Sequence, residues 1–412
     1  MGDMVGREVE LTVDRIAHGG ITVGRLDGRV VFVSDAIPGE TVVARVSDDR
    51  KKSFWRADTV RVIEASEHRR DHVWSAASID RDPRERAGGA EFGHIALAQQ
   101  RELKRQVVVE SLQRFAHLAE HELPGGAGAV RVEPLPGDDT ANGVGWRTRL
   151  RLHVDAEGRL GPMASRSHTV VPVMDAPLAT AAVQAATPFS ERFSGATTVE
   201  VLAPSVGEPR LVIDEQAPTV IRERVGERDF QLDDTGFWQV HRGAAAALTE
   251  AVQGAIDASL FDPRADNLDL YGGVGLLAAA VADHFGTSTR ITSVESDARA
   301  TDHAAENLAE WLGAGAENGR VDRWLRDRVK ASASLRGATV VLDPPRSGAG
   351  AEVMASLATL APAQIVYVAC DPVALARDVA LAAETGFTLR SLRAFDLFPH
   401  THHVEAVATL VR

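Results

Sequence analysis

From about Gln231 to the C-terminus, the sequence alternates short apolar runs with longer alanine-rich stretches. The runs at 267–270, 292–295, 338–342 and 364–368 have the length and β-branched content of buried strands. Alternating strands and helices favour a parallel sheet covered by helices on both faces. We therefore predict an α/β, Rossmann-like domain over residues 231–412.

The first part of the chain, residues 1–63, has the pattern of a small all-β domain. Five short apolar segments are separated by turn signals such as Gly19-Gly20, Asp27-Gly28 and Pro38-Gly39. This spacing predicts an OB-like barrel, a fold often used to hold RNA. Basic and aromatic side chains alternate here, which is typical of RNA contact, although a solvated edge with two core aromatics is the alternative: Arg45, Arg50, Lys51, Lys52, Phe54, Trp55, Arg56 and Arg61.

Residues 64–230 form a third region, with a helical linker followed by a β-rich middle domain. Within it, Arg147, Arg149 and Arg151 alternate with apolar residues, which is a strand pattern. One face of this strand would be strongly positive, or it would be a salt-bridged outer face. We expect the middle domain to contact RNA together with the barrel.

Composition excludes several classes of protein. The single cysteine, Cys370, excludes a disulfide within the chain and any cysteine-ligated iron–sulfur cluster. The N-terminal residues lack a basic stretch followed by an apolar core, and no apolar run is long enough to span a bilayer, so we expect a cytoplasmic protein. The net charge of −13 argues against coating nucleic acid through a global field but allows a local basic face.

A glycine-rich turn predicts the binding site for a nucleotide-type ligand. The strand at 267–270 runs into Tyr271-Gly272-Gly273-Val274-Gly275 and then into a helix, whose first amides and close backbone approach suit such a ligand. The next strand ends in Glu295, which can accept hydrogen bonds from ribose hydroxyls. The strand after it ends in Asp343-Pro344-Pro345-Arg346, a more specific signal.

Cys370 ends the apolar strand at 364–368 and is followed by the turn Asp371-Pro372. Ligands of open α/β sheets bind at the carboxyl ends of the strands, so this position suits a nucleophile. A buried core thiol is the alternative that position alone leaves open.

Taken together, these motifs resemble the uracil-5 RNA methyltransferases, which use S-adenosylmethionine (SAM). The resemblance covers nearly the whole chain. It includes the N-terminal barrel, which resembles a TRAM domain, and Phe237-Trp238-Gln239-Val240. The closing stretch carries it most strongly, with Tyr367 to Pro372 and Asp396 to Glu405.

The resemblance implies a C-terminal class I methyltransferase domain and a substrate uridine in transfer or ribosomal RNA. It implies that SAM or the flipped uracil is contacted by Gln239, Tyr271, Glu295 and Asp343, that Gly272, Gly273 and Gly275 form the loop beside the cofactor, and that Asp327 meets the adenine edge. We also expect a monomer that does not bind a membrane. Many relatives carry an iron–sulfur cluster where this chain has Ala90, and the cysteine count excludes a cluster here.

The chemistry that the resemblance implies needs one thiolate and one base. Carbon 5 of uracil becomes nucleophilic only after a thiolate adds to carbon 6, and a base must later remove the proton from carbon 5. Cys370 is the expected nucleophile and Glu405 the expected base. His400, His402 and His403 also suggest a metal site, but without a carboxylate at ligand spacing in the sequence we predict no metal.

Three other functions remain open. A cytosine-5 RNA methyltransferase resembles this chain but typically carries a cysteine after the Asp-Pro motif, where Asp343-Pro344-Pro345-Arg346 has none. An amino-group methyltransferase needs no cysteine and usually has an aromatic residue at the position of Arg346. A non-catalytic RNA-binding or ribosome-assembly factor would not need the intact glycine turn, Cys370 and Glu405.

Overall fold

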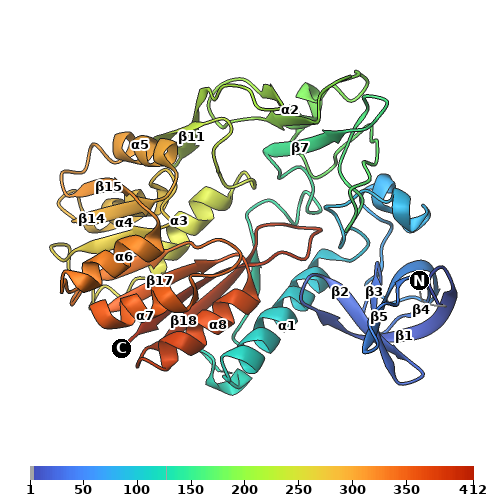
Figure 1. The fold of residues 1–412 in the computed structure, drawn as a ribbon, viewed down its shortest axis with the longest axis horizontal. Helices are drawn as coiled ribbons and strands as arrows, with labels where there is room; N and C mark the ends of the chain where they lie inside the picture. Colours follow the sequence, from blue (N-terminus) through green and yellow to red (C-terminus); the bar gives the residue numbers. More distant parts are fainter. Residues whose placement is uncertain (1–3, 127) are drawn as a thin grey trace.

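The computed structural model describes residues 4–126 and 128–412. Figure 1 shows a β-barrel at one corner, an extended middle domain along the opposite side, and a layered α/β domain that contains the C-terminus. The long helix α1 (Leu97–Phe115) lies between the barrel and the α/β domain. Within the described residues, no helix has the length and apolar content needed to cross a membrane.

The N-terminal barrel confirms the fold predicted for residues 1–63. Its strands close in the order β1-β2-β3-β5-β4, and β3 and β5 run parallel while the other neighbours are antiparallel. Alternate apolar residues of these strands fill the interior. The strands are β1 (Glu8–Ala17), β2 (Ile21–Leu26), β3 (Arg29–Ser34), β4 (Thr41–Asp48) and β5 (Phe54–Glu64).

The middle domain is β-rich, as predicted, but its arginine strand is not an open positive face. Arg149 is only 11% exposed, and its guanidinium donates to the carbonyl of Asp234 (2.7 Å) and to that of Gly236. Only Arg151 of the predicted strand is exposed. The elements are β7 (Arg149–Val154), β8 (Leu160–Gly161), α2 (Ala181–Ala186), β9 (Thr198–Leu202), β10 (Arg210–Ile213), β11 (Val220–Val225) and β12 (Arg228–Asp233).

The C-terminal domain contains the predicted sheet, in the order β15-β14-β13-β16-β17-β19-β18-β6. All neighbours are parallel except β19, which runs antiparallel between β17 and β18. The strands are β6 (Val132–Pro134), β13 (Asn267–Leu270), β14 (Ile291–Glu295), β15 (Ala314–Asn318), β16 (Thr339–Leu342), β17 (Gln364–Ala369), β18 (Thr388–Asp396) and β19 (Glu405–Val411).

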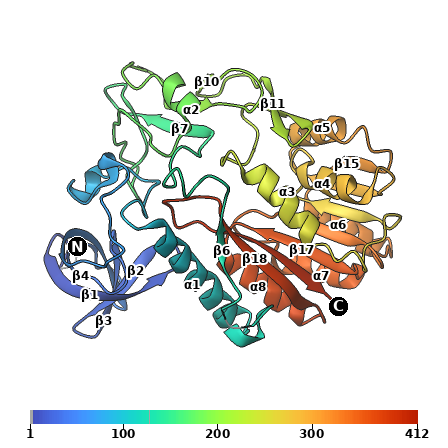
Figure 2. The ribbon, with the colours of Figure 1, turned by 180° about the vertical axis from the view of Figure 1, so that it is seen from behind.

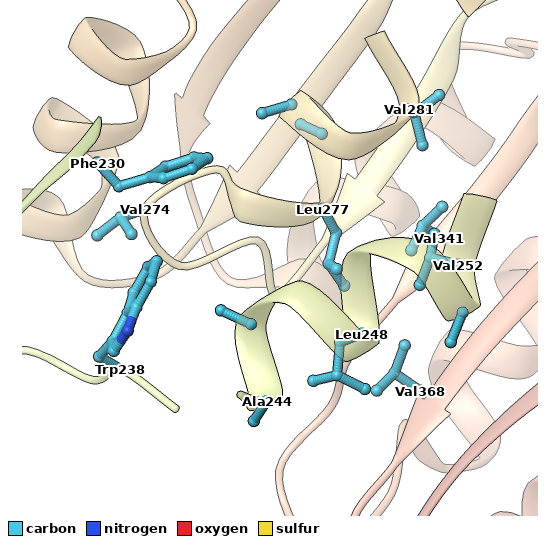
Figure 3. Packing of buried hydrophobic residues seen from close by; sticks show 14 of the residues in the cluster. Phe230, Trp238, Ala244, Leu248, Val252, Val274, Leu277, Val281, Val341 and Val368 are labelled. Atoms are coloured by element: carbon cyan, nitrogen blue, oxygen red, sulfur yellow. The ribbon is translucent and has the colours of Figure 1, made fainter. Parts of the chain in front are cut away.

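Helices cover both faces of this sheet because its strands are apolar on both sides. Val341, Val366 and Val368 pack against α3, α4 and α5, as Figure 3 shows for part of this cluster. The alternate residues Val340 and Tyr367 pack against the other layer, formed by α6, α7 and α8. The helices are α3 (Ala244–Ala255), α4 (Leu276–Phe285), α5 (Ala298–Asn307), α6 (Val321–Lys330), α7 (Gly350–Leu360) and α8 (Pro372–Ala383).

The sheet extends beyond the boundary predicted at residue 231. Strand β6 pairs with the edge strand β18, with Phe395 opposite Glu133, and α1 packs on α8 (Figure 2). Segments from the predicted middle region therefore complete the C-terminal domain. A strand of three residues carries too little periodicity to be recognised in the sequence.

Candidate active site

The register of the sheet brings the predicted catalytic residues to one edge. Ala369, the last residue of β17, lies opposite Ala406 of the antiparallel β19. Cys370, which follows β17, and Glu405, which begins β19, therefore lie at the same end of the sheet. Asp343 follows the adjacent parallel strand β16 and joins them there.

The predicted glycine turn follows β13 at this same end. Gly272 lies so close to the next strand that an added Cβ would overlap the hydroxyl of Ser293. The turn then leads directly into α4, with Gly275 in the left-handed region at φ 87°. Packing against Ser293 and Asp269 therefore requires glycine at position 272, and the approach of a nucleotide-type ligand to this turn stays a prediction.

Glu295, at the end of β14, is held beside the turn. Its Oε2 accepts a hydrogen bond from the amide of Gly273 at 3.1 Å, and its Oε1 accepts one from the amide of Asp297 at 2.8 Å. The carboxylate is half-buried, so one side remains open to a ligand. The structure thus places Glu295 next to Gly272, Gly273 and Gly275, as predicted.

Asp269 was missed by the sequence analysis. It is fully buried in β13, and its Oδ2 accepts hydrogen bonds from the amide of Ala278 (3.1 Å) and from Ser293 Oγ (3.3 Å). Its Oδ1 has no hydrogen-bond partner among residues 4–126 and 128–412. Burial, followed by the charge of Glu295, raises the pKa of Asp269 to about 7. An acid inside an otherwise apolar strand was the signal available in the sequence.

Burial raises the pKa of each of three acidic groups at this end of the sheet, and the charge of a neighbouring carboxylate adds to the rise. Burial and the Asp343 carboxylate raise the pKa of Glu405 well above its usual value, and Glu405 is only 3% exposed. Burial and Asp269 raise the pKa of Asp343 to about 7. Burial, Glu405 and Asp343 raise the pKa of the Cys370 thiol to about 12, while the Arg346 guanidinium opposes this rise. The site therefore favours protonated groups in the RNA-free protein.

Cys370 lines a small cavity of about 100 Å³. Arg346 and His403 line the same cavity, and Arg346 Nη2 lies 3.3 Å from His403 Nε2. Residues of the barrel and of α1 complete the lining. The thiol is therefore half-buried but accessible from a cavity, which favours a reactive site over a core position.

Two further predicted cofactor residues, Tyr271 and Gln239, lie near the glycine turn. Tyr271 begins the glycine turn with a strained φ of 62°, and burial raises its pKa to about 12. Gln239 is half-buried in the loop before α3, where its neighbour Trp238 packs in the same apolar cluster as Val274 of the glycine turn (Figure 3). Both residues are therefore carried to the end of the sheet where the turn lies.

The structure does not bring Asp327 to this group. Asp327 lies on the outer face of α6, its side chain is 73% exposed, and it pairs with Lys330 at 3.2 Å. Asp322, in the first turn of the same helix, is the acid near the site, because its charge contributes to the raised pKa of Tyr271. The two acids are five positions apart on a helix, where faces differ, and the sequence did not fix where this helix begins.

The loop between β18 and β19 is fixed by contacts with α1. Lys104 and Asp396 form an ion pair at 2.5 Å in which both side chains are 0% exposed, and Lys104 Nζ also donates to the carbonyl of Phe398 at 3.0 Å. The side chain of Gln100 contacts His400 Nδ1 at 3.0 Å and accepts from the His400 amide at 2.8 Å. These contacts position the loop that leads into Glu405.

The sequence shows no carboxylate at ligand spacing from His402 and His403, but the folded structure places one beside them. The fold brings Glu91, remote in sequence, to His402 and His403, so that one donor atom from each lies within 4.8 Å of the others. Glu91 forms an ion pair with His402, and Arg346 already contacts His403, so these interactions account for the cluster. The prediction that the site holds no metal stays a prediction.

The residues at the edge suit SAM. A sulfonium and an ammonium favour nearby carboxylates, and Asp269 offers, beside the glycine turn, a buried oxygen that has no partner within the part of the chain that the structure describes. Glu295 is placed for ribose hydroxyls. The sheet order, with its antiparallel β19, and this edge define a class I SAM-dependent methyltransferase domain joined to an RNA-binding type of barrel.

Comparison with known proteins agrees. The TRAM domain model matches residues 2–54, and the tRNA (uracil-5-)-methyltransferase model matches residues 225–412. An RNA methyltransferase of Streptomyces avermitilis is 36% identical, with 98% of each chain covered, and one of Bifidobacterium longum is 35% identical, with 98% of this chain and 97% of the other covered. The chain belongs to the tRNA (uracil-5-)-methyltransferase family and is a SAM-dependent RNA methyltransferase.

A solved structure shares the whole fold. The Pyrococcus abyssi tRNA (uracil-54, C5)-methyltransferase, in complex with S-adenosyl-L-homocysteine, matches with a TM-score of 0.69 and 21% identity, covering 97% of this chain and 100% of the other. At this identity, the likeness supports the architecture of barrel, middle domain and α/β domain. With one cysteine in the chain, a cysteine-ligated iron–sulfur cluster is excluded by ligand count.

Proposed function

We propose that this protein methylates carbon 5 of a uridine in structured transfer or ribosomal RNA, as a cytoplasmic monomer, through a covalent cysteine–uracil adduct. The observation that carries this proposal is the meeting of Cys370, Glu405 and Asp343 at the edge of the sheet that also holds the glycine turn. A thiol and a buried carboxylate at this place supply the nucleophile and the base that the reaction needs.

Cys370 acts first in the proposed reaction. Its sulfur adds to carbon 6 of the uracil, and the electrons of the 5,6 double bond move to the carbonyl at carbon 4 to give an enolate. Because the pKa of the thiol is raised to about 12, the thiolate is a minor species in the free protein, so the thiol proton must pass to water or to a nearby carboxylate as the bond to carbon 6 forms. Bound SAM supplies the electrophilic methyl group that carbon 5 takes up.

Glu405 completes the proposed reaction. As a carboxylate, it accepts the proton of carbon 5, the 5,6 double bond forms again, and the bond between carbon 6 and Cys370 Sγ breaks. A raised pKa makes Glu405 a stronger base than an exposed glutamate would be. Asp343 contributes to that basicity through its charge.

The cofactor pocket in this proposal is formed by residues from the glycine turn, the ends of neighbouring strands, the loop before α3 and the start of α6. Glu295 would accept from the ribose hydroxyls, and Asp269 and Asp343 would face the positive charges of SAM. Tyr271, Gly272, Gly273, Gly275 and Gln239 would line the remaining walls, and Asp322 replaces Asp327 as the acid nearest the adenine.

A groove supports RNA as the substrate. It has a volume of about 630 Å³, lies between the barrel and the middle domain, and shares Gly19, Gly20 and His402 with the cavity at Cys370. On the barrel, Arg29 lies 4.4 Å from the centre of the Trp55 ring, and Arg56 lies 5.8 Å from that of Phe54. Paired cations and rings of this kind suit stacked nucleotides.

The proposal is tested with RNA that contains 5-fluorouridine. Fluorine at carbon 5 cannot leave as a proton would, so the wild-type enzyme with SAM should accumulate a protein–RNA adduct, visible by denaturing electrophoresis and mass spectrometry. Cys370→Ala should form no adduct and no 5-methyluridine while binding SAM within about threefold of wild type, because the thiol faces the substrate. Methylation by the folded Cys370→Ala protein would contradict the proposal.

A second variant separates the base from the nucleophile. Glu405→Gln should form the adduct on ordinary uridine RNA and release it slowly, because no carboxylate remains to accept the proton of carbon 5. Transfer and ribosomal RNA fractions are then offered separately, and nucleoside mass spectrometry identifies which one gains 5-methyluridine. Turnover by Glu405→Gln at the wild-type rate would exclude Glu405 as the base.

A further inference from the structure

The turn between β1 and β2 of the barrel reaches the cavity at Cys370. His18, Gly19 and Gly20 line this cavity together with Cys370 and Asp371 of the catalytic domain. The barrel therefore contributes directly to the cavity, because its backbone and side chains, including that of His18, form part of the cavity wall.

His18 contacts the residue that follows the nucleophile. His18 Nε2 lies 2.8 Å from Asp371 Oδ2, and the two side chains are 48% and 19% exposed. This hydrogen bond is the largest cause of the raised pKa of His18. The other oxygen of Asp371, Oδ1, accepts from the amides of Val373 (3.0 Å) and Ala374 (2.8 Å) at the start of α8. Asp371 thus joins the barrel, the Cys370 turn and α8.

Gly20 fixes how closely the barrel approaches. Its backbone is left-handed, with φ of 71°, and an added Cβ would overlap the Cβ of His402 and lie 3.2 Å from the Phe92 ring. Gly19 beside it is also left-handed, at 86°, but an added Cβ there meets nothing within 4 Å. The contact at Gly20 is therefore specific, and it sets the turn against the loop that leads into Glu405.

We propose that the His18–Gly20 turn forms one wall of the pocket that receives the target uracil, and that His18 is a positioning residue that holds Cys370 through Asp371. The uracil in this statement rests on the function proposed above. The barrel then has two roles, since the same domain that offers a surface for RNA also closes the pocket around the base. An enzyme with a displaced barrel would lose adduct formation even where RNA still binds.

The first test uses the single cysteine of the chain and needs no RNA. In the full-length protein, the rate of Cys370 alkylation by iodoacetamide reports exposure and order at the pocket. His18→Ala should raise this rate about three- to fivefold, because it removes a side chain from the wall of the cavity that contains the thiol and frees Asp371 from a half-exposed pair. His18→Gln, which can still donate to Asp371, should restore most of the wild-type protection.

Arg15→Ala is the matched control. Arg15 lies on β1, three residues before His18, and contacts Glu110 of α1 at 3.3 Å, an exposed contact of the barrel that is not part of the cavity lining. Its alkylation rate should remain within about twofold of wild type. Equal rates for His18→Ala and Arg15→Ala would overturn the proposal.

The second test compares two glycines. Gly20→Ala and Gly19→Ala carry a similar backbone cost, because both positions are left-handed, but only Gly20→Ala forces the turn away from His402. Gly20→Ala should therefore raise the alkylation rate more than Gly19→Ala does, by about threefold or more. Identical effects of the two variants would mean that the turn does not close the pocket.

The third test uses RNA and separates the two proposals. With 5-fluorouridine RNA and SAM, His18→Ala should form adduct about three- to fivefold more slowly at saturating RNA, with RNA affinity within twofold of wild type. Absence of an adduct with the wild-type enzyme would refute the proposed function and leave the alkylation result as a property of the pocket. A wild-type adduct rate in His18→Ala would refute the role of His18 alone.

Discussion

Two buried groups of charged side chains lie on either side of the 396–405 segment, and they are built in opposite ways. Lys104 and Asp396 carry opposite charges, are fully buried, and satisfy each other. Asp269, Asp343 and Glu405 carry the same charge and have few donors, so each raises the pKa of a neighbour. The first group fixes the chain, whereas the second shifts the pKa values of its members far from those of exposed carboxyls, as functional sites often do.

The largest expected effect breaks the compensated group. Lys104→Met leaves the buried Asp396 carboxylate with the longer contact to Arg101 (3.4 Å) in place of the pair with Lys104, so the free energy of unfolding should fall by about 3 kcal/mol, measured by urea denaturation. Lys330→Met removes an exposed lysine whose pair with Asp327 is 68% and 73% exposed, and should change stability by less than about 0.5 kcal/mol. Equal losses for the two lysines would show that the buried pair does not stabilise the fold.

The next effect tests the uncompensated group through pH. The folded pKa of Asp343 is raised from 3.8 to about 7, so the folded state binds this proton more tightly than the unfolded state does, and stability falls as pH rises from about 4 to about 7. Asp343→Asn lacks this titration. The variant should therefore gain on the order of 1–3 kcal/mol relative to wild type between pH 4 and pH 7.

Urea denaturation at several pH values measures this gain, and Asp327→Asn is the control because its carboxylate is exposed on α6. If the free energy of unfolding changes with pH in the same way for Asp343→Asn and wild type, the pKa of Asp343 is not raised in the folded protein.

The smallest expected effect concerns the thiol. Because its pKa is raised to about 12, the rate of Cys370 alkylation should rise about tenfold per pH unit from pH 7 to pH 10 without a plateau near the ordinary value of about 8.5. Glu405→Gln removes one of the charges that raise this pKa, so the variant should react roughly three- to tenfold faster at the pH values where Glu405 is ionised. A plateau near pH 8.5 in the wild type would mean that the carboxylates do not act on the thiol.

Most of the fold follows from local patterns in the sequence. The barrel strands, the apolar strands of the α/β domain and the glycine turn all carry strong period and turn signals, and their positions were predicted within a few residues. Strand β6 was missed because three residues carry no pattern of their own and depend on pairing with β18. The sequence left open whether Arg149 lies on a positive face or on a salt-bridged one, because a long guanidinium can turn back to the carbonyls of a distant loop, as it does here.

The candidate site was predictable where residues sit at strand ends, as Cys370, Glu295 and Asp343 do. Contacts between distant segments were not predictable. The pairs His18–Asp371 and Glu91–His402 join residues separated by 353 and 311 positions, and only the fold brings them together. Asp322 was not considered from the sequence, because which side chains of α6 face the site depends on the rotation of this ten-residue helix, which sequence periodicity fixes poorly.

Completion of the α/β sheet by β6 has a consequence for how the chain is made. Glu133 on β6 pairs with Arg393 on β18, 260 residues later. At roughly 5–20 residues per second, translation delivers the second strand more than ten seconds after the first. During that time, the apolar side of α1 and the edge of β6 remain exposed on the nascent chain, without the segments that they pack against. Synthesis rate and chaperone holding therefore bear on the yield of active enzyme independently of its final stability.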